Sequence, residues 1–265
     1  MQLRARGRHP GHPPRRRSGL PALLLLLGLI GVGYAVSAPR GHAQAPAQTA
    51  TAVQEGRNLF LTSCASCHGL NAQGGNQAPP LIGKGGAAVD FQVSTGRMPL
   101  QQQGPQAARK PARFSQEDID RLAAYIQSLG GGPAVPSERD LDLADAKVSE
   151  GSGIFRANCA SCHSFAGQGG ALTRGKYAPN LTRATDRQIY EAMLTGPESM
   201  PRFGNGQITP DEKRSVIKFI RALDTESNPG GHGLGRLGPI PEGLVAFLIG
   251  LGVLVVMTLW IGARA

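Results

Sequence analysis

Two identical five-residue runs constrain this chain most: Cys-Ala-Ser-Cys-His at residues 64–68 and again at residues 159–163. A C-x-x-C-H run is the attachment signature of a c-type haem, whose porphyrin is bound by both thiols and whose iron takes the following imidazole as a ligand. All four cysteines of the chain lie in these runs. We therefore predict two covalently bound haem c groups. Their attachment and proximal ligation use Cys64, Cys67, His68, Cys159, Cys162 and His163.

Paired cysteines at this spacing have three other uses: a zinc half-site, a redox dithiol or a disulfide. A zinc site would require the two cysteine pairs to come together in space. The pairs lie 95 residues apart, and each is flanked by the same sequence landmarks. A thioredoxin-like dithiol should lie near a βαβ pattern, and the sequence shows none. The duplicated context favours haem attachment over these alternatives.

The residues around the two motifs repeat in the same order. Each motif follows a glycine and a phenylalanine, and precedes an Ala-Pro-x-Leu run, a Thr-Gly step before Met-Pro, and an amphipathic segment. Such an internal repeat identifies architecture. We therefore predict an all-α fold with two tandem modules and haem-centred cores, at residues 53–130 and 151–228.

The closing helix of each module has a recognisable start. Ser115 is a candidate N-cap with Asp118 three residues later, and Thr209 with Glu212 forms a capping box. Apolar residues then recur at helical spacing, and the glycines at 130–132 end the first of these helices.

The first helix of each module carries a glycine, Gly56 or Gly151. We expect these glycines to let the first helix approach the last one closely, against Tyr125 and its counterpart Phe219. The second module is longer than the first by about five residues between the motif histidine and the following proline, at 163–179.

A six-coordinate iron needs a second axial ligand. The histidines outside the motifs lie in the flanks of the modules: His9, His12, His42 and His232. Three methionines lie within the modules, and Met98 and Met200 share the Thr-Gly and Met-Pro context. We predict that these two ligate the irons, whereas Met193 is core filler in a short helix.

Two further repeated pairs have predicted supporting roles. A ligating imidazole usually donates its free N–H to a carbonyl, which fixes the ring orientation. We assign that carbonyl to Pro79 and Pro179, and we expect Leu81 and Leu181 to pack on the porphyrin edge. The alternative for each is an ordinary turn residue.

The N-terminal flank combines a basic segment, 1–19, with an apolar segment, 20–38, and a tether, 39–52. The apolar segment is a signal peptide or an uncleaved transmembrane signal-anchor, and the positive-inside rule places the residues after it on the outer side of the membrane. Six arginines within residues 1–17 account for most of the net charge of +10. This distribution argues against a nucleic-acid partner.

The second module is flanked by two contrasting segments. Residues 131–150 hold five acids and form an acidic linker, which is either a solvated connection or a docking strip for a basic partner. A tether at 229–242 leads to 243–262, where 20 residues carry no charge. That length spans a bilayer as a helix, with Trp260 near the far interface. We therefore predict one or two transmembrane helices.

Methionine ligation of both irons raises the reduction potential and leaves no open coordination position. The predicted chemistry is outer-sphere electron transfer. Two other classes remain: a free membrane-anchored dihaem carrier outside any obligate complex, and a haem enzyme such as a peroxidase or a thiosulfate-oxidising subunit, which would need a vacant axial site.

Each module resembles a class I cytochrome c domain, and the whole chain from about residue 53 resembles the dihaem cytochrome c subunit of the actinobacterial menaquinol–cytochrome c reductase. The runs that carry this resemblance are Phe91–Pro99, Gly169–Leu172, Gly175–Pro179, Met193–Pro197 and Leu259–Arg264.

The resemblance implies an electron relay within a translocating oxidoreductase of the cell membrane. The implied partners are a cytochrome b subunit, a Rieske iron–sulfur subunit that delivers electrons, and a cytochrome c oxidase that accepts them within a supercomplex. The haem domains are expected on the extracytoplasmic side. We expect the first module to receive electrons and the second to deliver them.

Overall fold

The computed structural model describes residue 21 and residues 23–29, 50–225 and 239–264. By its contacts the chain divides into residues 1–43 and 44–265. In the first unit the described residues are helical. The basic flank at 1–19 and most of the predicted signal or anchor segment and tethers lie outside the described residues.

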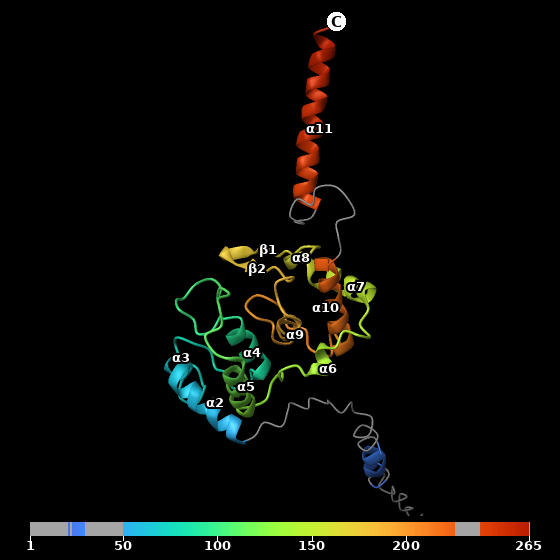
Figure 1. Cartoon of the computed structure of the whole chain (residues 1–265). Helices are drawn as coiled ribbons and strands as arrows, with labels where there is room; N and C mark the ends of the chain where they lie inside the picture. Colours follow the sequence, from blue (N-terminus) through green and yellow to red (C-terminus); the bar gives the residue numbers. More distant parts are fainter. Residues whose placement is uncertain (1–20, 22, 30–49, 226–238, 265) are drawn as a thin grey trace, which may run out of the picture. The chain divides into compact units, whose positions relative to one another are not determined.

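The first module contains four helices: α2 (Ala50–Ser63), α3 (Ala65–His68), α4 (Gly86–Ser94) and α5 (Gln116–Ser128). The second module repeats this order and adds a small hairpin. Its elements are α7 (Val148–Asn158), α8 (Ala160–His163), β1 (Gly170–Ala171), η1 (Thr173–Gly175), β2 (Tyr177–Ala178), α9 (Asp186–Thr195) and α10 (Pro210–Thr225). Figure 1 shows the first module in blue to green and the second in yellow to orange. The mostly helical fold confirms the predicted class.

The first and last helices of each module pack together through a glycine. A Cβ on Gly56 would lie 1.9 Å from the backbone oxygen of Arg121, and a Cβ on Gly151 would lie 1.9 Å from that of Ser215. No real side chain tolerates such a distance, so only glycine permits these crossings. The prediction of close approach at both glycines is confirmed.

The same crossings are filled by one aromatic pair each. The ring centroids of Phe60 and Tyr125 lie 5.3 Å apart, as do those of Phe155 and Phe219, and both pairs are tilted by 51–56°. Phe60 and Phe155 are fully buried. Such tilted pairs contribute beyond their buried area, and they confirm the predicted contacts.

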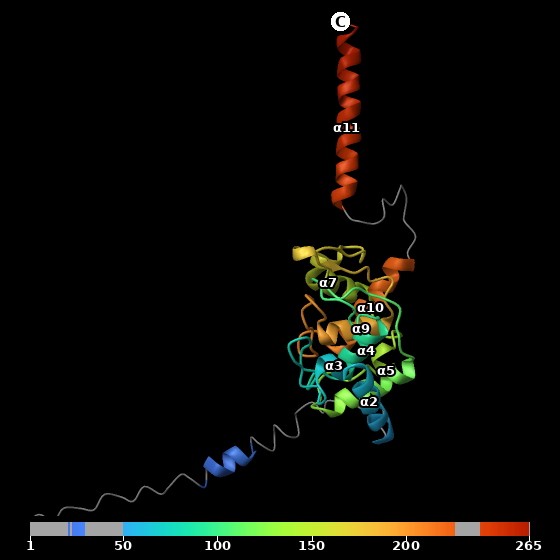
Figure 2. The same cartoon turned by 90° about the vertical axis from the view of Figure 1, so that its left-hand side faces the viewer.

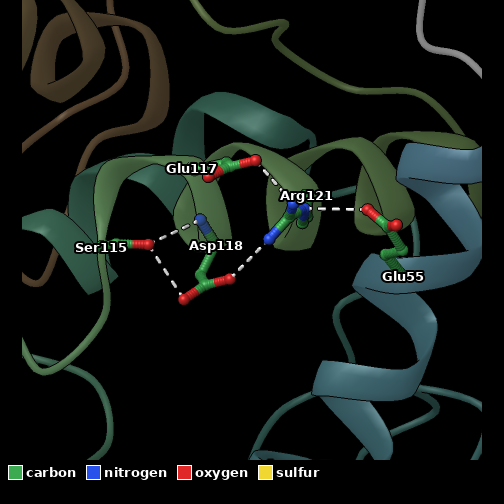
Figure 3. Close-up of polar contacts among 5 residues, drawn as sticks. All are labelled: Glu55, Ser115, Glu117, Asp118 and Arg121. Atoms are coloured by element: carbon green, nitrogen blue, oxygen red, sulfur yellow. Dashed lines mark hydrogen bonds and ion pairs between the residues drawn. The ribbon is translucent and has the colours of Figure 1, made fainter.

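The start of α5 is stabilised as predicted. The Ser115 hydroxyl accepts the backbone N–H of Asp118 at 3.2 Å. Arg121 then bonds the carboxylates of Glu117, Asp118 and Glu55, so that one guanidinium joins the first turn of α5 to α2 (Figure 3). The acids near the helix N-terminus also suit the helix dipole.

Helix α10 has the predicted capping box. The Thr209 hydroxyl accepts the N–H of Glu212 at 3.3 Å, while the Glu212 carboxylate accepts the N–H of Thr209 at 2.7 Å. Lys213 in the same turn is fully buried, and its ammonium donates to Asn205 and to the carbonyl of Ile208. Burial lowers the pKa of Lys213 to about 8.

The linker is more ordered than its composition suggests. It contains α6 (Glu138–Leu141), capped by Ser137 and Asp140, and Leu141 and Leu143 pack on the core of the second module. Lys218 of α10 donates to the carbonyl of Leu143 at 3.0 Å. A few apolar side chains thus attach this acidic segment to the protein, while most of its acidic side chains stay exposed to solvent.

The extra residues of the second module form an antiparallel hairpin, which the purely helical prediction missed. Strand β1 pairs with β2, with Gly170 opposite Ala178 and Ala171 opposite Tyr177. Two-residue strands have too little period-2 pattern to be recognised in a sequence.

The two modules contact each other through α4 and α9, which lie side by side in both views (Figures 1 and 2). Arg187 of α9 forms an ion pair with Asp90 of α4 at 3.2 Å. Glu191, one turn further along α9, is fully buried. Burial and the nearby Asp90 raise the pKa of Glu191 to about 10, so this carboxyl is neutral at physiological pH.

The C-terminal apolar segment is helical, as α11 (Pro239–Gly262). Within residues 241–262 the most apolar 18-residue window has a mean hydropathy of 2.7, and the helix is long and apolar enough to cross a membrane. Among the described residues it is the one helix that meets this test.

Candidate haem-binding sites

Each C-x-x-C-H motif forms a single helical turn directly after a longer helix. In the first module the N–H of Cys64 donates to Phe60 at 2.8 Å, and that of His68 donates to Cys64 at 3.0 Å. In the second, Cys159 donates to Phe155 at 2.8 Å. The buried phenylalanine thus positions the turn that carries the cysteines and histidine.

The surroundings of the thiols disfavour the alternative uses of these cysteines. All four cysteines are free. Burial, together with the second thiol of each motif, raises the pKa of Cys64 and of Cys159 to about 11. A redox-active dithiol would have a lowered thiol pKa instead. The described residues also contain no group of three or more His, Cys, Asp or Glu side chains that could hold a metal ion.

Both motif histidines contact the predicted prolines. Nδ1 of His68 lies 2.9 Å from the carbonyl oxygen of Pro79, and Nδ1 of His163 lies 3.0 Å from that of Pro179. Because a carbonyl can only accept, each Nδ1 is the donor, which leaves Nε2 as the nitrogen that can face an iron. Desolvation lowers the pKa of the buried His163, which keeps its ring neutral. A neutral imidazole with free Nε2 is the form that binds iron.

A tight turn brings each proline to its histidine. In the first module Gly74 donates to the carbonyl of His68 at 2.7 Å, and in the second Gly169 donates to that of His163 at 2.9 Å. Both glycines have a positive φ, and a Cβ on Gly169 would lie 2.2 Å from the Ala178 oxygen. The turn therefore requires glycine at this position.

The second module contains a deep cavity beside its motif. The predicted site residues that line it are Cys159, Cys162, His163, Pro179, Leu181 and Met200. The walls are mostly apolar, and the thiols, an imidazole and a thioether open on the same space. This donor set fits haem c, with histidine and methionine as the axial ligands.

Two methionines line this cavity. Met193 is 2% exposed and belongs to the buried core cluster, as expected for core filler. Its carbonyl accepts the N–H of Phe203 at 2.7 Å. Met200 is half-buried, follows a turn from Pro197 and packs at the edge of that cluster. The assignment of Met200 as the iron ligand stays a prediction.

In the first module the predicted residues take equivalent places. Leu81 packs on the same core cluster as Cys64, and its N–H donates to the carbonyl of Ala72 at 2.9 Å. Met98 is half-buried just after α4, and its N–H donates to the carbonyl of Gln92 at 2.9 Å. Its role as the axial ligand also stays a prediction.

The first module supplies part of the lining of the second cavity, which the repeat pattern did not predict. Phe91, Thr95, Arg97, Gln106 and Arg109 all line that cavity. Gln106 also clamps the hairpin, since its side-chain amide exchanges two hydrogen bonds with the backbone of Tyr177, at 3.0 and 2.9 Å. Nothing in the repeat pattern marks these residues, because the repeat describes each module separately.

Comparison with protein families supports the two-module interpretation. Residues 53–130 match the family described as cytochrome c, and residues 146–220 match the family described as cytochrome c oxidase, cbb3-type, subunit III.

Full-length relatives give a narrower assignment. Three proteins named cytochrome bc1 complex cytochrome c subunit resemble this chain over most of their length. The protein of Corynebacterium diphtheriae is 42% identical over 94% of this chain and 95% of its own. The protein of Mycobacterium tuberculosis is 44% identical, and the match covers 95% of this chain and 92% of the relative. The protein of Mycobacterium leprae is 46% identical, and the match covers 92% of this chain and 87% of the relative. The chain belongs to this family.

As a member of the bc1 complex cytochrome c subunits, the protein is a haem-binding electron-transfer protein, and the predicted family resemblance is confirmed. It is a component of an oxidoreductase complex, and its C-terminal helix has the length and apolar composition of a membrane anchor. The haem-enzyme alternative finds no support in these relatives.

Proposed function

We propose that this chain is the dihaem cytochrome c subunit of a translocating menaquinol–cytochrome c reductase. It receives electrons from a Rieske iron–sulfur subunit, next to a cytochrome b subunit, and passes them to a cytochrome c oxidase in a supercomplex. The observation that carries this proposal is the pairing of two matched C-x-x-C-H modules with family membership over the full length.

The haems supply one-electron redox chemistry, and the protein supplies their attachment and ligation. Cys64 and Cys67 would bind the first haem and Cys159 and Cys162 the second. His68 and His163 would ligate the irons through Nε2, which the proline carbonyls leave unprotonated. The opposite ligands would be Met98 and Met200.

Around each haem the chain's own residues hold the geometry. Pro79 and Pro179 would fix the imidazoles through carbonyl contacts of 2.9 and 3.0 Å. Leu81 and Leu181 would cover the porphyrin edge. Methionine sulfur stabilises ferrous iron, and two filled axial positions exclude oxygen and peroxide.

The haem modules would lie on the extracytoplasmic side of the cell membrane. The support is the basic flank at 1–19 before the first apolar segment, and Arg264 after the second. Thioether attachment of haem in bacteria also takes place on that side. A cysteine introduced at the exposed Ser149, outside the haem-attachment motif, would be labelled by a membrane-impermeant reagent in intact cells. Protection of that cysteine in intact cells would show the opposite orientation.

The first test is a reduced-minus-oxidised spectrum of the tagged protein, gently extracted from its own membranes and treated with menaquinol. We expect b-type and a-type haem bands beside the c-type band, all reduced by quinol. A c-type band alone that stays oxidised would indicate the free dihaem carrier instead.

A second test addresses the order of the relay. We propose that the first module receives electrons from the Rieske subunit and the second delivers them. Replacement of Met98 by alanine should then block reduction of both haems by quinol. Normal reduction of the Met200 haem in this variant would reverse the order.

A further inference from the structure

Arg97 is buried without a counter-ion. Its side chain belongs to the first module and is 6% exposed. Its Nε and Nη1 atoms have no hydrogen-bond partner, and the ion pairs of the described residues do not include it. Its guanidinium stacks on the Phe91 ring at 4.9 Å from the centroid.

Arg97 faces the cavity of the second module. It lines that cavity together with His163, Tyr177 and Glu198, all from the second module. Among the charges around it, Arg109 repels the guanidinium and Glu198 attracts it. The Glu198 carboxylate, however, accepts the backbone N–H of Ala107 at 3.0 Å and lies at the surface.

Such a cation requires an anionic partner. Burying an unpaired charge costs several kcal/mol, and a bound anion offsets that cost through charge-assisted hydrogen bonds. A haem c carries two propionate carboxylates on the porphyrin edge. Their planar geometry matches the fork of a guanidinium, which binds carboxylates through two parallel N–H groups.

We propose that Arg97 of the first module binds a propionate of the haem held by the second module. This inference rests on the proposed haem of the second site and adds a ligand that reaches it from the neighbouring module. Arg97 is thus a cofactor-binding residue for a haem to which its own module is not covalently joined.

The arrangement is one-sided. At the corresponding place before Met200 the second module has Pro197, Glu198 and Ser199, with no arginine. The equivalent position of the second module therefore supplies no cation to the first. An Arg97 substitution should act on the second haem and leave the first unchanged.

The test uses the full chain in its native membranes and resolves the midpoint potentials of the two c-type haems at mildly alkaline pH. M98H and M200H each lower one potential, since histidine replaces a ligand that favours ferrous iron, and they thereby assign the two components. R97Q should lower the potential of the M200H-sensitive component, because the cation that stabilises the reduced haem is gone. R97K should restore most of it.

A second readout is independent of electron flow. Redox-difference infrared spectra should show a changed propionate carboxylate band in both R97Q and R97K, because neither side chain can form the two parallel bonds. The exposed Arg113 serves as control, and R113Q should change neither readout.

Three results would overturn the inference. In the first, R97Q leaves both the potential of the M200H-sensitive component and the carboxylate band unchanged. In the second, R97Q shifts only the M98H-sensitive component, which would mean that Arg97 binds the haem of its own module. A wild-type chain with a single covalent haem would overturn the inference together with the proposed function. A haem count by pyridine haemochrome distinguishes this last case.

Discussion

The two modules share their helix crossing and differ in the loop that leads from the motif histidine to its proline. In the first module this loop is short, whereas in the second it contains the β1–β2 hairpin. The hairpin end at Tyr177 is held by Gln106 of the first module. The shared crossing therefore defines each haem site, and the added loop joins one module to the other.

A second difference concerns the buried residues at matching places in the closing helices. Ile119 of α5 and Lys213 of α10 lie four residues after their N-caps, and both are buried. The isoleucine packs in a core, while the lysine holds the loop before α10 through Asn205. Equivalent buried positions of the two modules can therefore hold an apolar or a polar side chain, provided that the polar side chain has hydrogen-bond partners.

The largest expected effect separates the two haem sites. Replacing Cys64 and Cys67 by alanine, or Cys159 and Cys162 by alanine, should each reduce the haem count from two per chain to one, because the thioether bonds hold the haem. Pyridine haemochrome quantification of the purified chain measures this. A double variant that keeps both haems would contradict the assignment of that motif.

The shared crossing should be equally sensitive in both modules. Gly56→Ala and Gly151→Ala each place a Cβ 1.9 Å from a backbone oxygen. We expect each to destabilise the protein by about 3 kcal/mol through forced separation of the helices. Thermal unfolding followed by circular dichroism provides the measurement.

A matched control for these glycines lies in the same helix. Gly153 of α7 has nothing within 4 Å of an added Cβ. Gly153→Ala should stabilise the protein by about 1 kcal/mol, since alanine is the better helix former. A loss of stability in Gly153→Ala comparable to that in Gly151→Ala would contradict the steric argument.

The interface between the modules should depend on pH. The folded protein keeps Glu191 protonated up to a pKa of about 10, whereas the unfolded chain releases that proton near its ordinary pKa of 4.5. The folded state binds more protons across that window, so stability falls as pH rises through it. Burial raises the pKa of Asp90 as well, which adds to the slope, and Arg187 opposes it.

Glu191→Gln tests this dependence, because glutamine stays neutral at every pH. As the pH rises from mildly acidic to mildly alkaline, the free energy of unfolding of the variant should increase by roughly 2 kcal/mol relative to that of the wild type. Denaturant unfolding at several pH values gives the slope. Parallel slopes in the two proteins would show that Glu191 titrates normally.

The smallest expected effect concerns the hairpin clamp. Gln106→Ala removes two hydrogen bonds to the Tyr177 backbone and should cost about 1 kcal/mol. Hydrogen exchange at residues 170–178 should rise, while the exposed Gln102→Ala leaves it unchanged. Unaltered exchange in Gln106→Ala would mean that the clamp does not hold the hairpin.

The sequence predicted the features that are local or repeated. The N-caps at Ser115 and Thr209, the crossing glycines and the aromatic pair at Phe60 and Tyr125 arise from short-range patterns, and the structure confirms them. The contacts of the motif histidines with the prolines also lie where the repeat placed them. Each of these features involves residues of a single module.

The features that the sequence did not predict depend on the contact between modules. Asp90 and Arg187 lie 97 residues apart, and neither belongs to a repeated landmark. Arg97 stands within the Met98 motif, yet its side chain faces the other module's cavity. Such residues look like ordinary surface charges until the tertiary structure brings their partners close.

The packing of α4 on α9 has a kinetic consequence. Because the two modules contact each other through fixed side chains of one polypeptide, the separation of their cofactors does not depend on protein concentration. Electron exchange between the two proposed haems would then be a first-order process, insensitive to dilution and to the ionic strength that governs encounters between separate proteins. Only electron transfer into and out of this chain would then depend on how partner proteins dock to it.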